Sequence, residues 1–357
     1  MDYQLNEEQM ALQRVAREFA KEEISPLVLE MDENERLNPN LIRRLAECGL
    51  QSLNTPSEYG GSGLDAMGSC IVLEELAKGC ASVAVAVAAT ALAAYPLLLA
   101  GTDAQKKRFL FSIGEGGGLA SFCLTEAEAG SDVSSIKATA EKQGREYILN
   151  GSKTFVSNGG VAEFYLVFAS TNPEKGAKGI SAFVVPKDTP GLYLGRKLHK
   201  MGIRAADTRE VVLEDVRVSK EHLVGKEGQG FVLAMEALDL ARPGVGAMAI
   251  GIAQGAFEKA VDYAKKRKQF GKHISDFQTI QMMIAEMHMK IEAARHIVLQ
   301  AAWKLEKGQP FTKEAAMAKA FASDVAMEVT TNAVQILGGY GYIRDYGMEK
   351  YMRDAKI

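Results

Sequence analysis

The sequence predicts an α+β protein in which helices and strands occupy separate parts of the chain. Three observations support this prediction: helical periodicity up to about residue 115, β-branched runs separated by turns from Leu119 to about Val218, and helical periodicity again after the glycine-rich turn Gly225–Gly230. Such an order indicates segregated layers and not alternating βαβ units. We therefore expect a helical domain over 1–115, a β domain over 116–222 and a helical domain over 223–357.

Composition and charge narrow the class of protein. The chain has 357 residues, of which 47% are hydrophobic and 24% charged, so it can build a sizeable core and is not expected to be disordered. Lys and Arg number 42 and Asp and Glu 45, which gives a net charge of −3. This balance excludes the basic footprint of a nucleic-acid-binding protein and a polybasic segment for a membrane surface.

The first part contains stretches with apolar residues at helical spacing. The predicted helices cover 6–24, 41–50, 67–80, 82–99 and 103–112. The stretch Ala81–Ala100 is uncharged and reaches the roughly 20 residues that span a bilayer. Because it is mostly alanine and contains Ser82, Thr90 and Pro96, we expect an apolar helix buried in the protein and not a membrane span.

The middle part contains short runs bounded by turn residues, which favour a small sandwich or barrel. The predicted strands are Leu119–Leu124, Tyr147–Val156, Tyr165–Ala169, Ile180–Val185, Gly191–Leu198 and Glu210–Val218. Asn150-Gly151 has the composition of a hairpin turn.

The last part contains one unbroken apolar stripe with spacing of three and four, which is typical of a helix in a bundle. Its members are Phe277, Ile280, Ile284, Met287, Ile291, Ala294, Val298, Ala301 and Leu305. Another helix is predicted from about Thr312 to Leu337, where Gly338-Gly339 provide a C-terminal cap and turn.

Several common functional motifs are absent or out of context. The segment Gly244–Ala249 (GVGAMA) has the letters of a dinucleotide fingerprint, but it lies in a helical run after Arg242-Pro243. We interpret its small residues as close helix packing. There is no P-loop, and the four cysteines and five histidines lack metal-ligand spacing, so no metal site is predicted and the thiols are expected to be reduced.

Two segments of the middle part are candidate ligand sites. In Phe122–Asp132 a strand ends at Leu124 and the chain turns through Thr125, Gly130 and Ser131, which offer hydroxyls and free backbone N–H groups to a phosphate or the polar edge of a heterocycle. An ordinary loop would use the same residues.

In Asn150–Gly160, alternation puts Phe155 and Ser157 on one face of a strand, where they could stack on a flat ring and hydrogen-bond its edge. A core Phe beside a surface Ser is the alternative.

Two segments of the last part are further candidates. Arg267–Lys272, followed by Gln278, could hold a pyrophosphate through charge-assisted hydrogen bonds, or could be a solvated basic turn. Gln335–Tyr342 (QILGGYGY) is a helix end whose glycines permit close backbone approach to a ligand.

Taken together, these segments resemble the acyl-CoA dehydrogenase family, in its short- or medium-chain or butyryl-CoA branch. The shared motifs, in order, are LTEAEAGSD, NGSKTFVSNGG, MGIRAADTR with LEDVRV, DLARP, RKQFGK, QILGGYGY and RDAKI. The resemblance implies a helical N-terminal domain, a middle β-barrel and a C-terminal four-helix bundle. It also implies FAD-dependent oxidation of an acyl-CoA thioester to the trans-2-enoyl-CoA, with electrons passed to an electron-transfer flavoprotein.

The resemblance also assigns residues. FAD would contact Phe122, Leu124, Thr125, Gly130, Ser131, Phe155 and Ser157, and the FAD of a neighbouring subunit would be reached by Arg267, Phe270, Gln278, Gln335 and Gly339. The CoA moiety would contact Ser131, Asp239 and Arg242, and the helix with Ala84, Val85 and Ala88 would line an uncharged acyl pocket. Sharing FAD sites between subunits predicts a homo-oligomer, typically a tetramer.

Two departures concern the catalytic base. Most members carry it in a Tyr-Glu-Gly-Thr segment soon after RDAKI, whereas this sequence stops at Ile357. Another branch has Glu immediately before the Arg of the DLxR motif, where this chain has Ala241. No base is recognisable, and we expect it beyond Ile357, in a C-terminal piece that the sequence lacks.

Two other functions remain open. A flavin oxidase or monooxygenase on the same scaffold is disfavoured by Asp239 and Arg242, and a non-catalytic flavin or acyl-CoA binding protein would suit a chain without a base.

The acidic, polar N-terminus has no apolar run of a signal peptide and lacks the Arg-rich bias of a transit peptide. We therefore expect a bacterial cytoplasmic protein, with the mitochondrial matrix as the alternative location.

Overall fold

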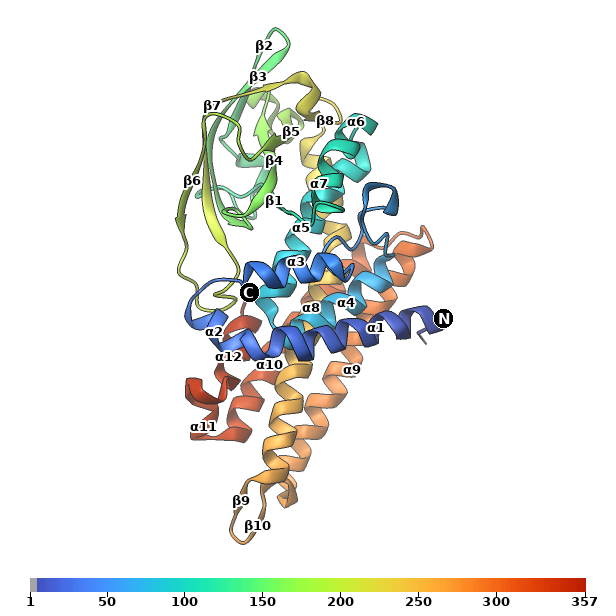
Figure 1. The fold of residues 1–357 in the computed structure, drawn as a ribbon, viewed down its shortest axis with the longest axis vertical. Helices are drawn as coiled ribbons and strands as arrows, with labels where there is room; N and C mark the ends of the chain where they lie inside the picture. The colour runs from blue at the N-terminus through green and yellow to red at the C-terminus, as the bar shows by residue number, and fades with distance from the viewer. Residues whose placement is uncertain (1–4) are drawn as a thin grey trace.

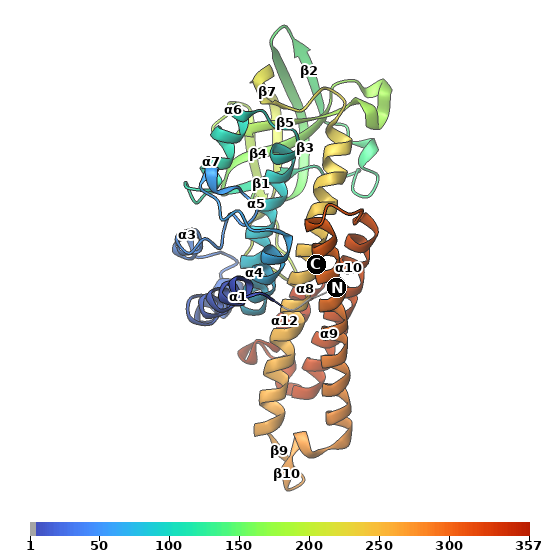
Figure 2. The ribbon, with the colours of Figure 1, turned by 90° about the vertical axis from the view of Figure 1, so that its right-hand side faces the viewer.

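Helices and strands are segregated along the chain, which confirms the predicted α+β class (Figure 1). The computed structural model describes residues 5–357. A β part lies at one end of the long axis, a bundle of long helices forms the other end, and the N-terminal helices pack beside the middle (Figures 1 and 2).

The N-terminal part is helical from its first described turn. Asn6 caps α1 by accepting a hydrogen bond from the backbone N–H of Gln9 at 2.8 Å, and the Gln9 side chain accepts one from the Asn6 N–H in return. The α-helices are α1 (Glu7–Phe19), α2 (Val28–Glu33), α3 (Pro39–Glu47), α4 (Ala66–Gly79), α5 (Ala81–Ala100), α6 (Asp103–Gln105) and α7 (Phe111–Ile113). Short 3-10 or π turns connect them: η1 (Ala20–Ile24), η2 (Ser25–Leu27), η3 (Ser57–Tyr59) and η4 (Lys106–Leu110).

The middle part forms one sheet in the order β6-β7-β3-β2-β4-β5-β8, and β1 pairs in parallel with β4. Its strands are β1 (Leu119–Cys123), β2 (Thr139–Gln143), β3 (Glu146–Ser157), β4 (Ala162–Ser170), β5 (Ile180–Pro186), β6 (Leu192–Lys197), β7 (Thr208–Ser219) and β8 (Leu223–Val224). Three 3-10 turns belong to the same part: η5 (Val133–Ser135), η6 (Pro173–Gly179) and η7 (Lys220–His222).

The hairpin predicted at Asn150-Gly151 is wrong. Strand β3 runs straight through both residues, and the pairing with β7 shifts by one residue there. The turn that joins β2 to β3 contains Gly144 at φ 63°. The Asn150 side chain instead donates to Asp215 at 3.1 Å and accepts from its backbone N–H at 2.8 Å, so this pair serves a bulge and not a turn.

The C-terminal part consists of long helices that lie side by side (Figure 2). They are α8 (Gly230–Lys266), α9 (Gln278–Glu306) and α10 (Thr312–Leu337), followed by the short α11 (Gly339–Tyr342), η9 (Arg344–Tyr346) and α12 (Met348–Ala355). The strands β9 (Lys268–Gln269) and β10 (Lys272–His273) form a hairpin at the far end of the bundle, and η8 (Ile274–Asp276) leads into α9. The predicted stripe of α9 is buried from Met287 to Ala301, and Leu305 at its end is partly buried.

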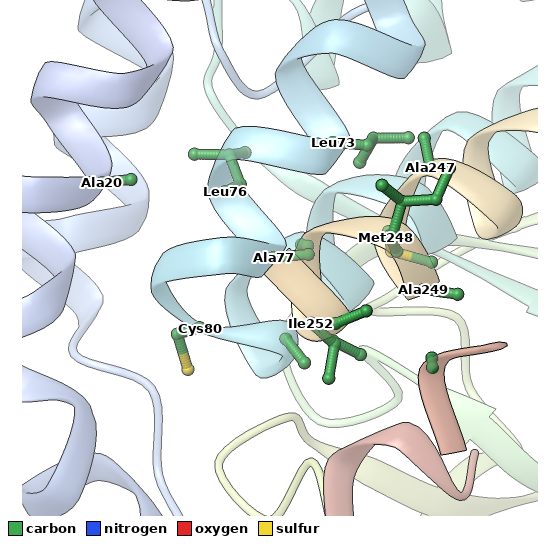
Figure 3. Packing of buried hydrophobic residues seen from close by; sticks show 14 of the residues in the cluster. Ala20, Leu73, Leu76, Ala77, Cys80, Ala247, Met248, Ala249 and Ile252 are labelled. Carbon is green, nitrogen blue, oxygen red and sulfur yellow. The ribbon is translucent and has the colours of Figure 1, made fainter. Parts of the chain in front are cut away.

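Helix α8 packs closely on its neighbours through small residues (Figure 3). The segment Gly244–Ala249 lies inside this helix, which confirms the packing interpretation of its small residues. A Cβ at Gly246 would lie 2.8 Å from a methyl of Val298 on α9. One turn apart on the same helix, Gly251 faces the carbonyl oxygen of Glu74 and Gly255 that of Lys78, both on α4. Two helix backbones therefore approach more closely than any side chain would allow.

Candidate active site

A cavity of about 420 Å³ lies between α4, α5 and α8. Its wall is mostly apolar and includes Leu73, Val85, Ala88, Leu92, Ala241, Gly244, Val245 and Met248. Val85 and Ala88, two of the predicted acyl-pocket residues, line it. Ala84, the third, is fully buried in the helical core and does not face the cavity.

One side of the cavity is polar. The Tyr95 hydroxyl donates to the Asn54 side chain at 2.9 Å, and Asn54 donates to the Ser69 hydroxyl at 2.7 Å. Two carboxylates also line the cavity and cap the start of α4: Asp65 accepts from the Gly68 N–H and Glu306 from the Met67 N–H, both at 2.7 Å. Burial raises the pKa of Glu306, so its charge is costly in this position.

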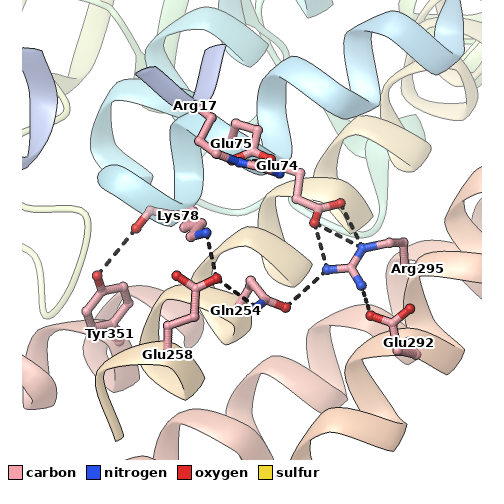
Figure 4. A network of polar contacts seen from close by, with 9 residues as sticks. All are labelled: Arg17, Glu74, Glu75, Lys78, Gln254, Glu258, Glu292, Arg295 and Tyr351. Atoms are coloured by element: carbon pink, nitrogen blue, oxygen red, sulfur yellow. Dashed lines mark hydrogen bonds and ion pairs between the residues drawn. The ribbon is translucent and has the colours of Figure 1, made fainter. Parts of the chain in front are cut away.

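Ion pairs brace α4 against α8 and α9 behind the cavity (Figure 4). Arg295 of α9 donates to Glu74 at 2.8 Å, to Gln254 at 3.2 Å and to Glu292. Burial raises the pKa of Glu74, and the charge of Arg295 opposes that rise. Sequence periodicity did not point to this network, because its members are polar residues on three helices that are far apart in the sequence.

Helix α5 separates the cavity from the β part. On its other face, Thr90 accepts a hydrogen bond from the Ala120 N–H at 3.2 Å. The buried Asn158 side chain donates to the Ala86 carbonyl at 2.9 Å and to the Ala120 carbonyl at 3.1 Å. The end of β3 is therefore fixed to α5. Asn158 stands in the quoted NGG turn, but nothing in the sequence indicated that its side chain is buried.

Helix α5 is the one helix among residues 5–357 that is long and apolar enough to cross a membrane. In this structure half of its most apolar window is buried, against α4, α8 and β1.

The predicted residue Phe122 lies in β1, Leu124 and Thr125 follow that strand, and Phe155 and Ser157 lie near the end of β3. Two hydrogen bonds join these segments: the Ser121 hydroxyl donates to the Ser157 carbonyl at 2.8 Å, and the Thr154 N–H to the Thr125 carbonyl at 2.9 Å. The structure thus brings both segments together.

Phe155 does not follow the expected strand alternation. The pairing of β3 with β7 shifts between Lys153 and Val156, and Phe155 has φ 57°, a conformation that bulky residues rarely adopt. Its ring is 66% exposed, whereas Val156 is buried in the β core. Strain of this kind gathers at ligand sites.

Polar groups without a protein partner lie beside this strand end. Thr208 is the cross-strand neighbour of Ser157 on β7, and its hydroxyl is buried without a partner among the described residues. The backbone N–H of Thr125 likewise has no acceptor within residues 5–357. Predicted residues Gly130 and Ser131 lie in the exposed loop that follows, and a Cβ added at Gly130 would meet no other atom within 4 Å.

The predicted CoA residues form an ion pair on α8, between Arg242 and Asp239. The second carboxylate oxygen of Asp239 accepts a hydrogen bond from the Thr312 hydroxyl at 2.9 Å. Ala241, next to Arg242, lies in the cavity wall. At the position where another branch of the family has a glutamate base, this chain therefore offers only a methyl group.

The remaining predicted residues lie far from the β part within one chain. Arg267 caps the end of α8, Phe270 lies in the turn of the β9–β10 hairpin, Gln278 begins α9, and Gln335 and Gly339 lie at the junction of α10 and α11. The Arg267 guanidinium lies 5.6 Å from the ring centre of Tyr340, which joins the hairpin to α11. Phe270 is 93% exposed.

Metal ligation and a second cavity are the other features that bear on the site. No group of three or more His, Cys, Asp or Glu side chains that could hold a metal ion occurs in the described part of the chain. A second cavity of about 690 Å³ lies between the α2–α3 turn and the β part, lined in part by Arg36, Lys197 and Arg209. None of the predicted site residues lines it.

The chain matches the three domains of one enzyme family. Residues 6–117 match the acyl-CoA dehydrogenase N-terminal domain, residues 121–216 the middle domain and residues 228–357 the C-terminal domain. The short-chain-specific acyl-CoA dehydrogenase of Clostridium acetobutylicum is 44% identical over 358 residues, which cover 100% of this chain and 94% of that protein.

Solved structures agree over the whole chain. Butyryl-CoA dehydrogenase from Megasphaera elsdenii has a TM-score of 0.97 and 46% identity, covering 100% of this chain and 94% of its own. A chain from a study of the electron-transferring flavoprotein of Acidaminococcus fermentans and flavin-based electron bifurcation has a TM-score of 0.98 and 48% identity, with the same coverage. The predicted resemblance is confirmed, and this chain belongs to the acyl-CoA dehydrogenase family.

Proposed function

We propose that this chain is an FAD-dependent acyl-CoA dehydrogenase that converts an acyl-CoA thioester to the trans-2-enoyl-CoA and passes the electrons to an electron-transfer flavoprotein. The observation that carries the proposal is the position of α5. One of its faces lines an apolar cavity, and the other is hydrogen-bonded to the strand end that bears Phe155 and Ser157. A thioester in the cavity and a flat redox ring beside this strand end would therefore both lie next to the same segment of α5.

The residues present fit FAD. A flat heterocycle with a polar edge needs an aromatic surface and several hydrogen-bond donors. Phe155 offers the exposed ring, and the Thr125 N–H and the Thr208 hydroxyl are donors without protein partners among the described residues. We propose that Phe122, Leu124, Thr125, Gly130, Ser131, Phe155 and Ser157 contact the cofactor.

The reaction removes one hydrogen from each of two adjacent carbons. The α C–H bond gives its proton to a base and its electron pair to the new double bond. FAD, when bound, supplies the acceptor for the β hydrogen, which leaves with its electron pair as hydride. The apolar wall around Val85, Ala88 and Met248 excludes water from the acyl chain, which strengthens hydrogen bonds to the thioester carbonyl.

The base is not at the alternative position on α8, because Ala241 has no group that accepts a proton. Asp65 and Glu306 are the carboxylates that line the cavity, and both accept hydrogen bonds from the start of α4. We assign neither of them as the catalytic base. The predicted base is still a glutamate in a Tyr-Glu-Gly-Thr segment. For the CoA moiety we propose Ser131, Asp239 and Arg242, and for the acyl chain Val85 and Ala88, which line the cavity, whereas the predicted Ala84 does not.

We propose that each FAD site is completed by a second copy of the chain. Arg267, Phe270, Gln278, Gln335 and Gly339 would reach the cofactor of a neighbouring subunit in a homotetramer. The exposure of Phe270, and the separation of its hairpin from the β part, support this. Mixing a Phe155→Ala variant with an Arg267→Ala variant should restore part of the flavin binding that each variant loses alone, because some sites in the mixed oligomer are intact. No recovery would contradict shared sites.

We further infer domains at 1–115, 116–222 and 223–357, and a cytoplasmic location, since the relatives named above come from bacteria. Oxidation of this kind belongs to fatty acid β-oxidation.

The function is tested by reconstituting the purified protein with FAD under anaerobic conditions and adding saturated acyl-CoA thioesters of increasing length. Bleaching of the visible flavin absorbance, and reduction of a dye or of an electron-transfer flavoprotein, are expected. Flavin binding without bleaching by any thioester would favour a non-catalytic binding protein. Rapid peroxide formation in air would favour an oxidase.

A further inference from the structure

The β part contains a buried ion pair that the proposed reaction does not use. Lys153 on β3 is fully buried, and its ammonium group donates to Glu126 at 2.6 Å and to the backbone carbonyl of Leu124 at 3.1 Å. Burial lowers the pKa of Lys153, and the hydrogen bond and charge of Glu126 oppose this change. A buried lysine is stable in this setting only while both acceptors stay in place.

Glu126 is fixed from the other side. Its two carboxylate oxygens accept the backbone N–H groups of Lys137 at 2.6 Å and Ala138 at 3.0 Å. Its own backbone closes a tight loop with Ala129, with N–H to carbonyl distances of 3.0 and 3.2 Å. The loop after β1 is therefore attached to the start of β2 and, through Lys153, to β3.

The direction of one peptide group follows from this attachment. All peptide bonds of residues 5–357 are trans, so the carbonyl of Leu124 and the N–H of Thr125 point in opposite directions. The carbonyl points into the β part, toward the Lys153 ammonium group. The Thr125 N–H therefore points out of the β part, where no described residue accepts it.

The same strand carries the other wall of the site. Lys153 is followed by Thr154, whose N–H donates to the Thr125 carbonyl at 2.9 Å, and then by the exposed Phe155. One buried side chain thus fixes the distance between the Thr125 loop and the Phe155 ring.

We propose that Lys153, with Glu126, is a positioning residue for the flavin: it orients the Thr125 N–H toward the ring and holds that donor in register with Phe155. The inference rests on the proposed function, since it needs FAD in this crevice. An N–H group of fixed direction stabilises whichever redox state of the ring carries more negative charge on its acceptor. Loosening it should change the affinities for oxidised and reduced flavin unequally.

The test compares Lys153→Met and Glu126→Gln with the wild type, after removal and re-addition of FAD. Lys153→Met should raise the Kd of FAD at least tenfold and change the ratio of the two redox-state affinities about tenfold, which corresponds to about 30 mV for a two-electron couple. Glu126→Gln keeps an amide oxygen as acceptor and should shift both quantities in the same direction but less. Lys153→Arg should recover part of the wild-type values.

Two controls separate positioning from stability. Arg295→Met breaks a partly buried ion pair with Glu74 in the helical bundle, so it should lower stability and leave the Kd and the redox ratio unchanged. Lys142→Met removes a surface ion pair with Glu227 from the same sheet and should change neither.

A wild type that does not bind FAD would overturn the proposed function and this inference with it. A wild type that binds FAD, with a folded Lys153→Met or Glu126→Gln variant of unchanged Kd and redox ratio, would overturn this inference alone. If Lys153→Met does not fold, Glu126→Gln decides.

Discussion

Replacing Gly251 by alanine tests the close approach of α8 to α4. A Cβ at this position would collide with the Glu74 carbonyl oxygen and lie 2.9 Å from the Ala77 Cβ. Ordinary contact begins at 3.4 Å, so the Ala77 contact alone requires 3.4 − 2.9 = 0.5 Å of separation, and the closer carbonyl oxygen requires more. Because that oxygen is backbone, the two helices must move apart as units.

Two opposing effects set the magnitude. Alanine is favoured over glycine inside a helix by about 1 kcal/mol. Overpacking of this kind costs about 1–3 kcal/mol, and a rigid backbone neighbour places Gly251→Ala at the upper end. We therefore expect a net loss of about 2 kcal/mol in the free energy of unfolding.

The measurement is urea unfolding of the FAD-bound protein, followed by far-UV circular dichroism and by flavin release. The matched control is Gly244→Ala on the same helix, whose Cβ would meet only the terminal methyl of Leu73, at 2.8 Å. A flexible side chain can move aside, so the control should stay within about 1 kcal/mol of the wild type. Equal stability of the two variants would show that contact with the Glu74 backbone does not set the cost of the added methyl group.

Three further predictions concern the cavity, the α8 ion pair and pH. Ala88→Leu narrows the cavity and should lower kcat/KM for longer acyl chains at least tenfold relative to short ones, since one methylene in an apolar pocket is worth about 1–3 kcal/mol; an unchanged chain-length profile would contradict the cavity's role. Arg242→Gln removes a charge from the proposed CoA contacts and should raise KM about tenfold with a smaller effect on kcat; a kcat effect alone would argue against binding. Burial lowers the pKa of His222 below 6.5, so protonation favours the unfolded chain and stability falls as pH decreases through 6.5 toward the folded pKa. In urea titrations at several pH values, His222→Gln should reduce this loss of unfolding free energy at low pH. An unchanged pH dependence of the unfolding free energy would exclude His222 as its source.

The fold was predictable where periodicity was long and regular. The apolar stripe on α9 and the small residues of α8 predicted a helical bundle, because residues that face a neighbouring helix recur about once per helical turn. Strand β2 was missed because four of its five residues (Thr139–Gln143) are exposed and it carries little apolar signal. Asn150-Gly151 was misassigned because a bulge and a turn favour the same residue types.

The site was predictable to the level of segments. Motif order indicated which loops matter, and the structure places Thr125 and Phe155 on joined segments. The positive φ of Phe155 and the buried position of Asn158 could not be predicted, because both arise from contacts between parts of the chain more than 30 residues apart. In the sequence, Lys153 cannot be told from an ordinary surface lysine, because its burial depends on how the strands of the sheet pair.

Helix α5 has two structural roles, which alternate every few residues along its length. Ala86 and Thr90 are tied to the sheet, while Val85 and Ala88 border the cavity. In a saturation mutagenesis library of this helix, tolerance should therefore follow two stripes: substitutions on one would retune substrate preference and keep the fold, whereas those on the other would disturb the sheet. Laboratory evolution toward new thioesters would find its accessible steps along the first stripe only.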